Sequence, residues 1–333
     1  MNLSTTYLGL NLRSPVIVGS SSLTSNVKNV KKCARFGAGA VVLKSLYEEQ
    51  ILVDTDELVN QDDMYLWYPE AYEYVNKLSK EDGIDQYLNL IKECKKETDL
   101  PIIASINCIT PEDWPIFSRD LEKAGADAIE LNISIFPDSE ELSCTEIGDR
   151  HIRIVRAVSK QVNIPVSAKI SHYFSNLRMM AKRLYMAGAK GLVVFNRFYR
   201  PDIDIEKMKM TTDDTFSGPD EMTMSLRWVG LLSVNSPYDI SASTGVHDAT
   251  AVIKQLLAGA NSVQVCSTLY KYGFSYLKKI NEEMEIWMRK KGFSSIDEFR
   301  GLINKDPQNT AAWERIHFMK KTTSNTIRPI QND

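Results

Sequence analysis

The sequence has few of the residues that bind metals or build disulfide frameworks. Its 333 residues include only 4 His and 5 Cys, and no two cysteines form a Cys-x-x-Cys pair. A zinc site needs several ligands of these types at close spacing, so no metal site is predicted. An odd number of scattered thiols is typical of free cysteines in a reducing compartment. The cysteines are Cys33, Cys94, Cys108, Cys144 and Cys266.

Long hydrophobic runs and an excess of positive charge are also missing. The longest apolar runs, such as Ser14 to Gly19 and Ala38 to Leu43, are far too short to span a membrane. Lys and Arg number 40 against 43 Asp and Glu, and this balance argues against nucleic acid as a partner. Met1 to Ser4 carry no basic patch and lead into no signal-like apolar segment. The sequence therefore predicts a cytoplasmic protein whose partner is a small molecule.

A join built from glycine and other small residues recurs four times. Each copy follows an amphipathic, helix-like stretch and precedes a short apolar run. Glycine can adopt the left-handed conformation that ends a helix, and its small neighbours let the chain turn tightly into a strand. The four joins are Phe36 to Ala40, Ala124 to Ala128, Ala187 to Gly191 and Ala258 to Ser262.

Proline precedes the other apolar runs, at positions where a strand needs no ladder hydrogen bond. These prolines are Pro15, Pro101, Pro165 and Pro237. Together the two joins give eight continuous apolar runs, as expected for strands buried on both faces of a parallel sheet. The runs begin near residues 16, 41, 102, 128, 166, 191, 239 and 263.

Eight strand–helix units predict an α/β fold, the (β/α)8 barrel. A doubly wound open sheet has the same alternation and stays open as the alternative. Between the strands, the pattern predicts helices over residues 26–36, 113–123, 147–160, 175–187 and 248–257.

The spacing of the runs predicts insertions after the second and sixth strands. Tyr47 to Gly83 and Arg197 to Trp228 should overhang the site, because the carboxyl ends of barrel strands face the active site. A long charged helix is expected past Tyr270. One barrel domain over residues 1–300 and a tail over residues 301–333, packed on the outside, complete the expected organisation.

Two lysines stand at the ends of predicted strands. Lys44 closes the second strand and Lys169 lies within the fifth, each after aliphatic residues. A lysine in a buried strand either has a function or extends its amine to solvent. Amides and small residues follow other predicted strands. Because the carboxyl ends of barrel strands meet at one opening, these groups together would suit the binding of a polar heteroaromatic ring and its substrate. They are Gly19, Ser20, Asn107, Asn132 and Asn196.

The loops after the seventh and eighth strands are where barrels often bind phosphate. Here they read Ser243 to Asp248 and Cys266 to Thr268, and each leads into a predicted helix. Small residues at these helix starts fit a phosphate site, although Ser and Thr are also ordinary helix caps.

Six stretches in this order match one family. They are Ser14 to Ser21, Gly39 to Ser45, Glu130 to Ser134, Ala168 to Ile170, Ser243 to Val246 and Gln264 to Thr268. From Leu3 to about Phe299 the chain resembles the dihydroorotate dehydrogenases, above all the class 1 enzymes. The resemblance implies an FMN-binding barrel, a role in pyrimidine biosynthesis and a homodimer.

The resemblance also implies places for individual residues. Around the flavin ring and ribityl chain it puts Gly19, Ser20, Lys44, Ser45, Asn107, Asn132 and Lys169. Around the phosphate it puts Ser217, Gly218, Thr244, Gly245, Cys266 and Ser267. Substrate binding would fall to Asn132, Asn196 and Arg197, and catalysis to Lys44, Lys169 and Asn132.

The sequence departs from the family where the catalytic base belongs. The class 1 pattern has Cys at the place of Ile135, and an aliphatic side chain cannot accept a proton. Cys144 is the preferred replacement, with His151 and His172 as further candidates. The family's pyrimidine-clamping loop is unrecognisable in Tyr65 to Asp82. Arg197 replaces a Ser or Thr.

Three functions follow from these observations. The first is an FMN-dependent oxidoreductase that moves a hydride between flavin N5 and a small CH–CH substrate, dihydroorotate by family default. The second is an FMN-binding homologue that is inactive on dihydroorotate or acts on another substrate, such as an anion met by Arg197 or Arg200. The third is a non-redox barrel that binds a phosphorylated substrate in the same loops.

Overall fold

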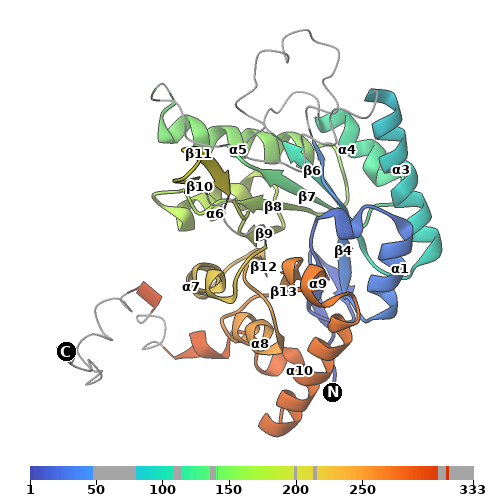
Figure 1. Ribbon diagram of the computed structural model, residues 1–333, viewed down its shortest axis with the longest axis vertical. Helices are drawn as coiled ribbons and strands as arrows, with labels where there is room; N and C mark the ends of the chain where they lie inside the picture. Colours follow the sequence, from blue (N-terminus) through green and yellow to red (C-terminus); the bar gives the residue numbers. More distant parts are fainter. Residues whose placement is uncertain are drawn as a thin grey trace, which may run out of the picture.

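Eight parallel strands form a closed ring in the computed structural model (Figure 1). The structure describes residues 1–47, 80–108, 114–135, 140, 142–198, 201–212, 216–306 and 313–314. In ring order the strands are β3 (Val16–Val18), β4 (Ala40–Val42), β6 (Ile102–Cys108), β7 (Ala128–Ile133), β8 (Val166–Ile170), β9 (Gly191–Val194), β12 (Asp239–Ala242) and β13 (Ser262–Val265). The ring closes because β13 pairs with β3 and β4 pairs with β6. The predicted barrel is confirmed, and the open sheet is excluded.

A helix follows each barrel strand along the chain and covers the outside of the ring (Figure 1). The helices are α1 (Val27–Arg35), α3 (Lys80–Glu97), α4 (Trp114–Lys123), α5 (Cys144–Ser159), α6 (Leu177–Ala187), α7 (Met222–Leu232), α8 (Ala249–Leu257), α9 (Ser267–Tyr272) and α10 (Tyr276–Lys291). Strand residues such as Val41, Ile129 and Val263 are fully buried under them. No helix among the described residues is long and apolar enough to cross a membrane.

The glycine joins have the predicted backbone. Gly37, Gly125, Gly188 and Gly259 all have positive φ, from +88° to +121°. Side chains other than glycine rarely adopt this conformation, so each glycine lets its helix end and the chain enter the next strand.

A short hairpin that the sequence pattern did not reveal closes the bottom of the barrel. β1 (Thr5–Tyr7) pairs antiparallel with β2 (Leu10–Leu12). Tyr7, Leu8 and Leu12 are buried and pack against residues of β3, β4, β6 and β7. This layer seals the amino-terminal end of the ring, so the opposite end is the one available for a site.

Three other elements differ from the predictions. The predicted lid Arg197 to Trp228 is wrong in its last part, because Met222–Leu232 form the outer helix α7. The preceding residues contain a hairpin of β10 (Pro201–Asp204) and β11 (Lys209–Thr212). Helix α5 begins at Cys144, three residues before the predicted start, because Ser143 and Glu146 form a capping box.

Two predicted segments lie largely outside the described residues. Most of the first insertion, Tyr47 to Gly83, is among them; a two-residue strand, β5 (Leu46–Tyr47), precedes it. In the tail, Asn304 donates hydrogen bonds to the carbonyls of Gly230 and Ala258. The Trp313 indole in turn donates to the Asn304 side chain, at 2.9 Å.

Gly39, just before β4, lies very close to the backbone that leads into β3, and a substitution there tests this close approach. A Cβ at this position would lie 1.9 Å from the Ser14 carbonyl oxygen. We expect Gly39→Ala to lower the free energy of unfolding by about 1–3 kcal/mol, because the backbone must shift. In urea unfolding the matched control, Gly83→Ala in helix α3, should be neutral or slightly stabilising, since its Cβ meets nothing within 4 Å. Equal effects at both sites would contradict this account.

Candidate active site

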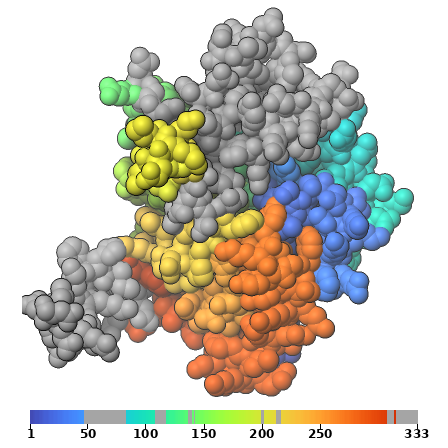
Figure 2. Space-filling model, in the orientation of Figure 1, coloured from blue at the N-terminus to red at the C-terminus, as the bar shows by residue number. Residues whose placement is uncertain are grey.

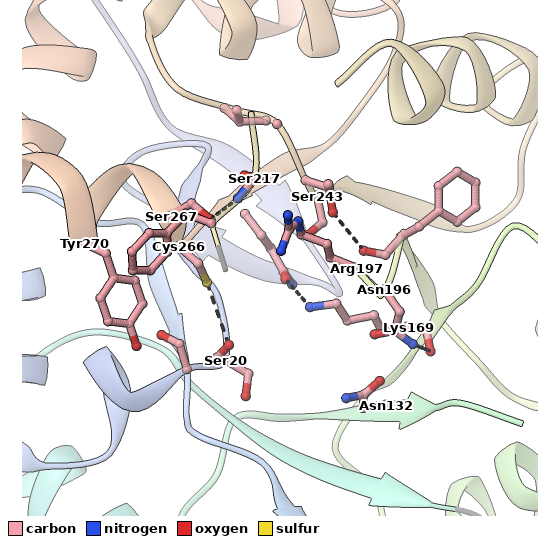
Figure 3. A pocket seen from close by; sticks show the side chains of 17 residues that line it. Ser20, Asn132, Lys169, Asn196, Arg197, Ser217, Ser243, Cys266, Ser267 and Tyr270 are labelled. Carbon is pink, nitrogen blue, oxygen red and sulfur yellow. Dashed lines mark hydrogen bonds between the residues drawn. The ribbon is translucent and has the colours of Figure 1, made fainter. Parts of the chain in front are cut away.

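A cavity of about 210 Å³ opens at the carboxyl ends of the strands (Figure 3). Ten of the site residues predicted from the sequence line it. These are Ser20, Asn132, Lys169, Asn196, Arg197, Ser217, Thr244, Gly245, Cys266 and Ser267. Seven further residues complete the wall. Ser243 and Val246 belong to the predicted phosphate loop, and the other five had no individual role assigned from the sequence: Ser21, Phe195, Phe216, Gln264 and Tyr270.

The cavity floor carries a buried polar triangle. The Lys169 ammonium lies 3.7 Å from Glu130 Oε1 and donates to Gln264 Oε1 at 3.3 Å. Gln264 Nε2 donates to Glu130 Oε2 at 2.6 Å. These groups come from β8, β7 and β13, so they meet across the barrel rather than along one strand. The floor therefore presents one fixed positive charge to the cavity.

Asn132 stands beside Lys169 on the neighbouring strand, in direct register with it. Its side-chain carbonyl oxygen Oδ1 is buried and accepts no hydrogen bond from the residues that the structure describes. Unsatisfied buried acceptors are uncommon and costly. A ligand with an N–H or O–H group near this point would satisfy it.

Hydroxyl groups link the first three strands at the mouth. Ser45 N donates to Ser20 Oγ at 2.9 Å, and the Ser45 and Ser105 hydroxyls lie 2.8 Å apart. The Tyr87 hydroxyl on α3 donates a hydrogen bond to the Ser105 carbonyl and accepts one from the Ser105 backbone N–H. The chain of hydroxyls fixes Ser20 where it lines the cavity.

Five of the predicted residues lie beside the cavity without forming its wall. Lys44 is half-buried next to Ser45, and Asn107 is buried in register with Asn132. Gly19 is packed behind the wall, since a Cβ there would lie 2.9 Å from Cys266 Sγ. The full set is Gly19, Lys44, Ser45, Asn107 and Gly218.

The opposite end of the cavity is built from small residues and backbone. Ser217 N donates to Ser267 Oγ at 3.0 Å, and the Ser217 hydroxyl lies 3.2 Å from His247 Nε2. Burial and the nearby Lys271 ammonium lower the pKa of His247, which favours the neutral ring. Gly245 has positive φ and a Cβ there would clash with the Met222 backbone, so the turn requires glycine.

An ion pair forms the side of the cavity. Arg197 Nε lies 3.0 Å from Glu221 Oε2 and its Nη2 lies 3.3 Å from Oε1, a two-point contact. Glu221 also accepts from Gly218 N at 2.8 Å. The pair therefore connects the predicted substrate side to the predicted phosphate loop. Beyond it lies an adjoining cavity of about 430 Å³ that includes His172 and Tyr173.

Cys144 does not reach the main cavity. It is exposed at the start of α5 and lines a separate cavity of about 400 Å³ together with Ile135 and His151. Burial lowers the pKa of His151 to about 4, so its ring is neutral at physiological pH. The structure thus brings Ile135 and Cys144 together, but apart from Lys169 and Asn132.

The sequence offered only partial signals for the residues it missed. Gln264 and Glu130 lie inside two of the family-matching stretches, yet their contact depends on the ring bringing β7 and β13 face to face. Glu221 had no signal, because only the folded loop places it against Arg197. No group of three or more His, Cys, Asp or Glu side chains suited to a metal occurs in the described part of the chain.

Comparison with known proteins agrees with this arrangement. The family model described as dihydroorotate dehydrogenase matches residues 2–288. A dihydroorotate dehydrogenase B (NAD(+)) catalytic subunit from Thermoplasma volcanium is 28% identical over 321 residues, covering 91% of this chain and 99% of the relative. Proteins of the same name from Pyrococcus abyssi and Pyrococcus furiosus are 27% and 28% identical, covering 91% and 92% of this chain and 99% and 100% of their own lengths. The chain therefore belongs to the dihydroorotate dehydrogenase family.

Proposed function

We propose that this protein is an FMN-dependent oxidoreductase whose flavin occupies the main cavity. One observation carries the proposal: a fixed lysine charge and a buried, unsatisfied amide oxygen share one end of the cavity, and hydroxyls and backbone form the other. FMN has the matching polarity, with a hydrogen-bonding ring at one end and a phosphate at the other. The family match independently supports a flavin.

The cavity residues fit the two ends of FMN. Asn132 Oδ1 would accept from the ring, and Lys169 would place its charge beside it. Ser217, Gly245 and Ser267 would hold the phosphate through hydroxyls and backbone N–H groups. Helix α9 has only six residues, so these local donors matter more than a helix dipole.

Bound FMN would supply the hydride-accepting atom, N5. The protein's own contribution is electrostatic and geometric. Lys169 favours negative charge that develops on the ring, because its ammonium is held in a buried site where solvent screens it little. Lys44 follows β4 and would add a second positive charge.

Substrate would lie near Asn196 and Arg197. The Asn196 amide is oriented by the carbonyls of Ile133 and Lys169, both at 3.4 Å. Arg197 is positioned by Glu221 and would attract a carboxylate such as that of dihydroorotate. Dihydroorotate, a place in pyrimidine biosynthesis and a cytoplasmic location are proposed on the family alone.

A second candidate is favoured by position 135. Ile135 offers no proton acceptor and lines the separate cavity with Cys144. A protein of this family without a base at that point would bind FMN yet be slow or inactive with dihydroorotate, or would act on a substrate that needs no such base.

Anaerobic mixing with dihydroorotate distinguishes these candidates. If the protein is a dihydroorotate-type oxidoreductase, dihydroorotate bleaches the flavin absorbance of the FMN-loaded protein without any substitution. If the absence of a base at position 135 limits the reaction, bleaching is slow and Ile135→Cys accelerates it by about 10²–10⁴-fold, the usual contribution of a general base. Reduction that is lost in Cys144→Ala would identify Cys144 as the base.

Other outcomes of this experiment refute parts of the proposal. If dihydroorotate bleaches neither protein while dithionite bleaches both, dihydroorotate is not the substrate. If the purified protein is colourless and takes up no added FMN, the flavin proposal fails and the phosphorylated-substrate barrel is favoured.

We also propose a homodimer formed through the β10–β11 hairpin, which stands at the surface in yellow in Figure 2. Ile203 pairs with Met210, and Ile205 and Met208 lie in the turn that connects the two strands. All four side chains are at least 60% exposed. A two-stranded ribbon with such a face is marginally stable alone.

Sedimentation velocity tests the dimer. The unmodified protein should sediment as a dimer, and Ile203→Asp combined with Met210→Asp should sediment as a monomer, because charges would be buried in the apolar interface. Met186→Asp is the matched control, since Met186 is 73% exposed on α6, outside the hairpin. An unmodified monomer, or a double variant that stays dimeric, would refute this interface.

A further inference from the structure

Glu130 is a carboxylate in the interior of the barrel with no exposed surface. Its Oε2 accepts from Gln264 at 2.6 Å. Its Oε1 accepts no hydrogen bond in the described part of the chain, and the Lys169 ammonium lies 3.7 Å from it. A buried carboxylate of this kind is stable in its charged form only when a cation compensates it. Among the described residues, Lys169 is the cation that forms an ion pair with Glu130.

Lys169 depends on the same contacts. Its side chain is only 13% exposed, and Nζ donates to Gln264 Oε1 at 3.3 Å. Gln264 thus accepts from the ammonium and donates to the carboxylate, which orients its amide. Figure 3 draws the hydrogen bond of the Lys169 amine as a dashed line. The lysine has three rotatable donors on a flexible stem, so fixed acceptors are needed to hold it in one place.

The triangle also joins strands that are not neighbours. Lys169 on β8 lies beside β7, but β13 lies opposite β7, with three strands between them in each direction around the ring. The carboxylate, the amide and the ammonium therefore meet in the barrel interior, where charges interact more strongly than at the surface.

We propose that Glu130 is a positioning residue for the flavin reaction, an inference that rests on the proposed FMN site. It holds the Lys169 ammonium at the cavity floor and partly neutralises its charge. Glu130 thereby sets how strongly the floor favours reduced, negatively charged flavin over oxidised flavin. A purely structural role would stabilise the barrel without affecting that balance.

Glu130→Gln tests this, because it keeps the shape of the side chain and removes the negative charge. We expect the reduced-to-oxidised flavin ratio at fixed potential and pH 7 to rise by about tenfold or more. For a two-electron couple this is an upward shift of about 30 mV in midpoint potential. Asp239→Asn is the matched control, since that carboxylate lies at the opposite end of the barrel and accepts from Leu8 N at 2.7 Å.

A second measurement needs no flavin. Acetic anhydride should acylate Lys169 about tenfold faster in flavin-free Glu130→Gln than in the unmodified protein, because the carboxylate that holds the amine at 3.7 Å is lost. Peptide mass spectrometry gives the rate relative to exposed Lys278.

The outcomes separate the two proposals. An unchanged midpoint potential together with unchanged Lys169 acylation would overturn the role of Glu130. Equal shifts in Asp239→Asn would overturn it too, since the effect would then be general. If the unmodified protein takes up no FMN, the proposed function fails, and the acylation rates alone decide whether Glu130 holds the lysine.

Discussion

Closure of the parallel ring is the constraint on which the rest of this structure depends. Pairing of β4 with β6 brings all eight strands into one ring, so every carboxyl end meets at the same mouth. Tyr7, Leu8 and Leu12 seal the other end. The lysine of β8, the glutamate of β7 and the glutamine of β13 contact one another only because the ring is closed. Function is thereby confined to one end of the molecule.

The barrel strands were predictable because each has a local cause. Continuous apolar runs indicate strands buried on both faces, and glycines such as Gly125 and Gly188 end the helices before them at positive φ. The β1–β2 hairpin was not predictable, since its three-residue strands gain stability from tertiary burial of Tyr7. Helix α7 was missed because the spacing of strands showed an insertion but not its internal division.

The candidate site was predictable to the extent that it follows strand ends. Lys169, Asn132 and Asn196 were identified there, and they line one cavity. Glu130 and Glu221 were not assigned roles, because their importance lies in contacts between distant parts of the chain. Cys144 shows the limit of reasoning by proximity in sequence: it follows Ile135 closely, yet the cap at Ser143 fixes it at the start of α5, outside the main cavity.

Protection of Cys266 by FMN tests the central claim, that the main cavity is the flavin site. Flavin-free protein would be alkylated with iodoacetamide at increasing FMN, and each cysteine followed by mass spectrometry. We expect alkylation of Cys266 to fall as FMN saturates, while exposed Cys144 reacts at a constant rate. Cys33 and Cys94 should stay unmodified, because burial raises their pKa to about 12 and about 11. Saturation by FMN with undiminished Cys266 alkylation would contradict the account.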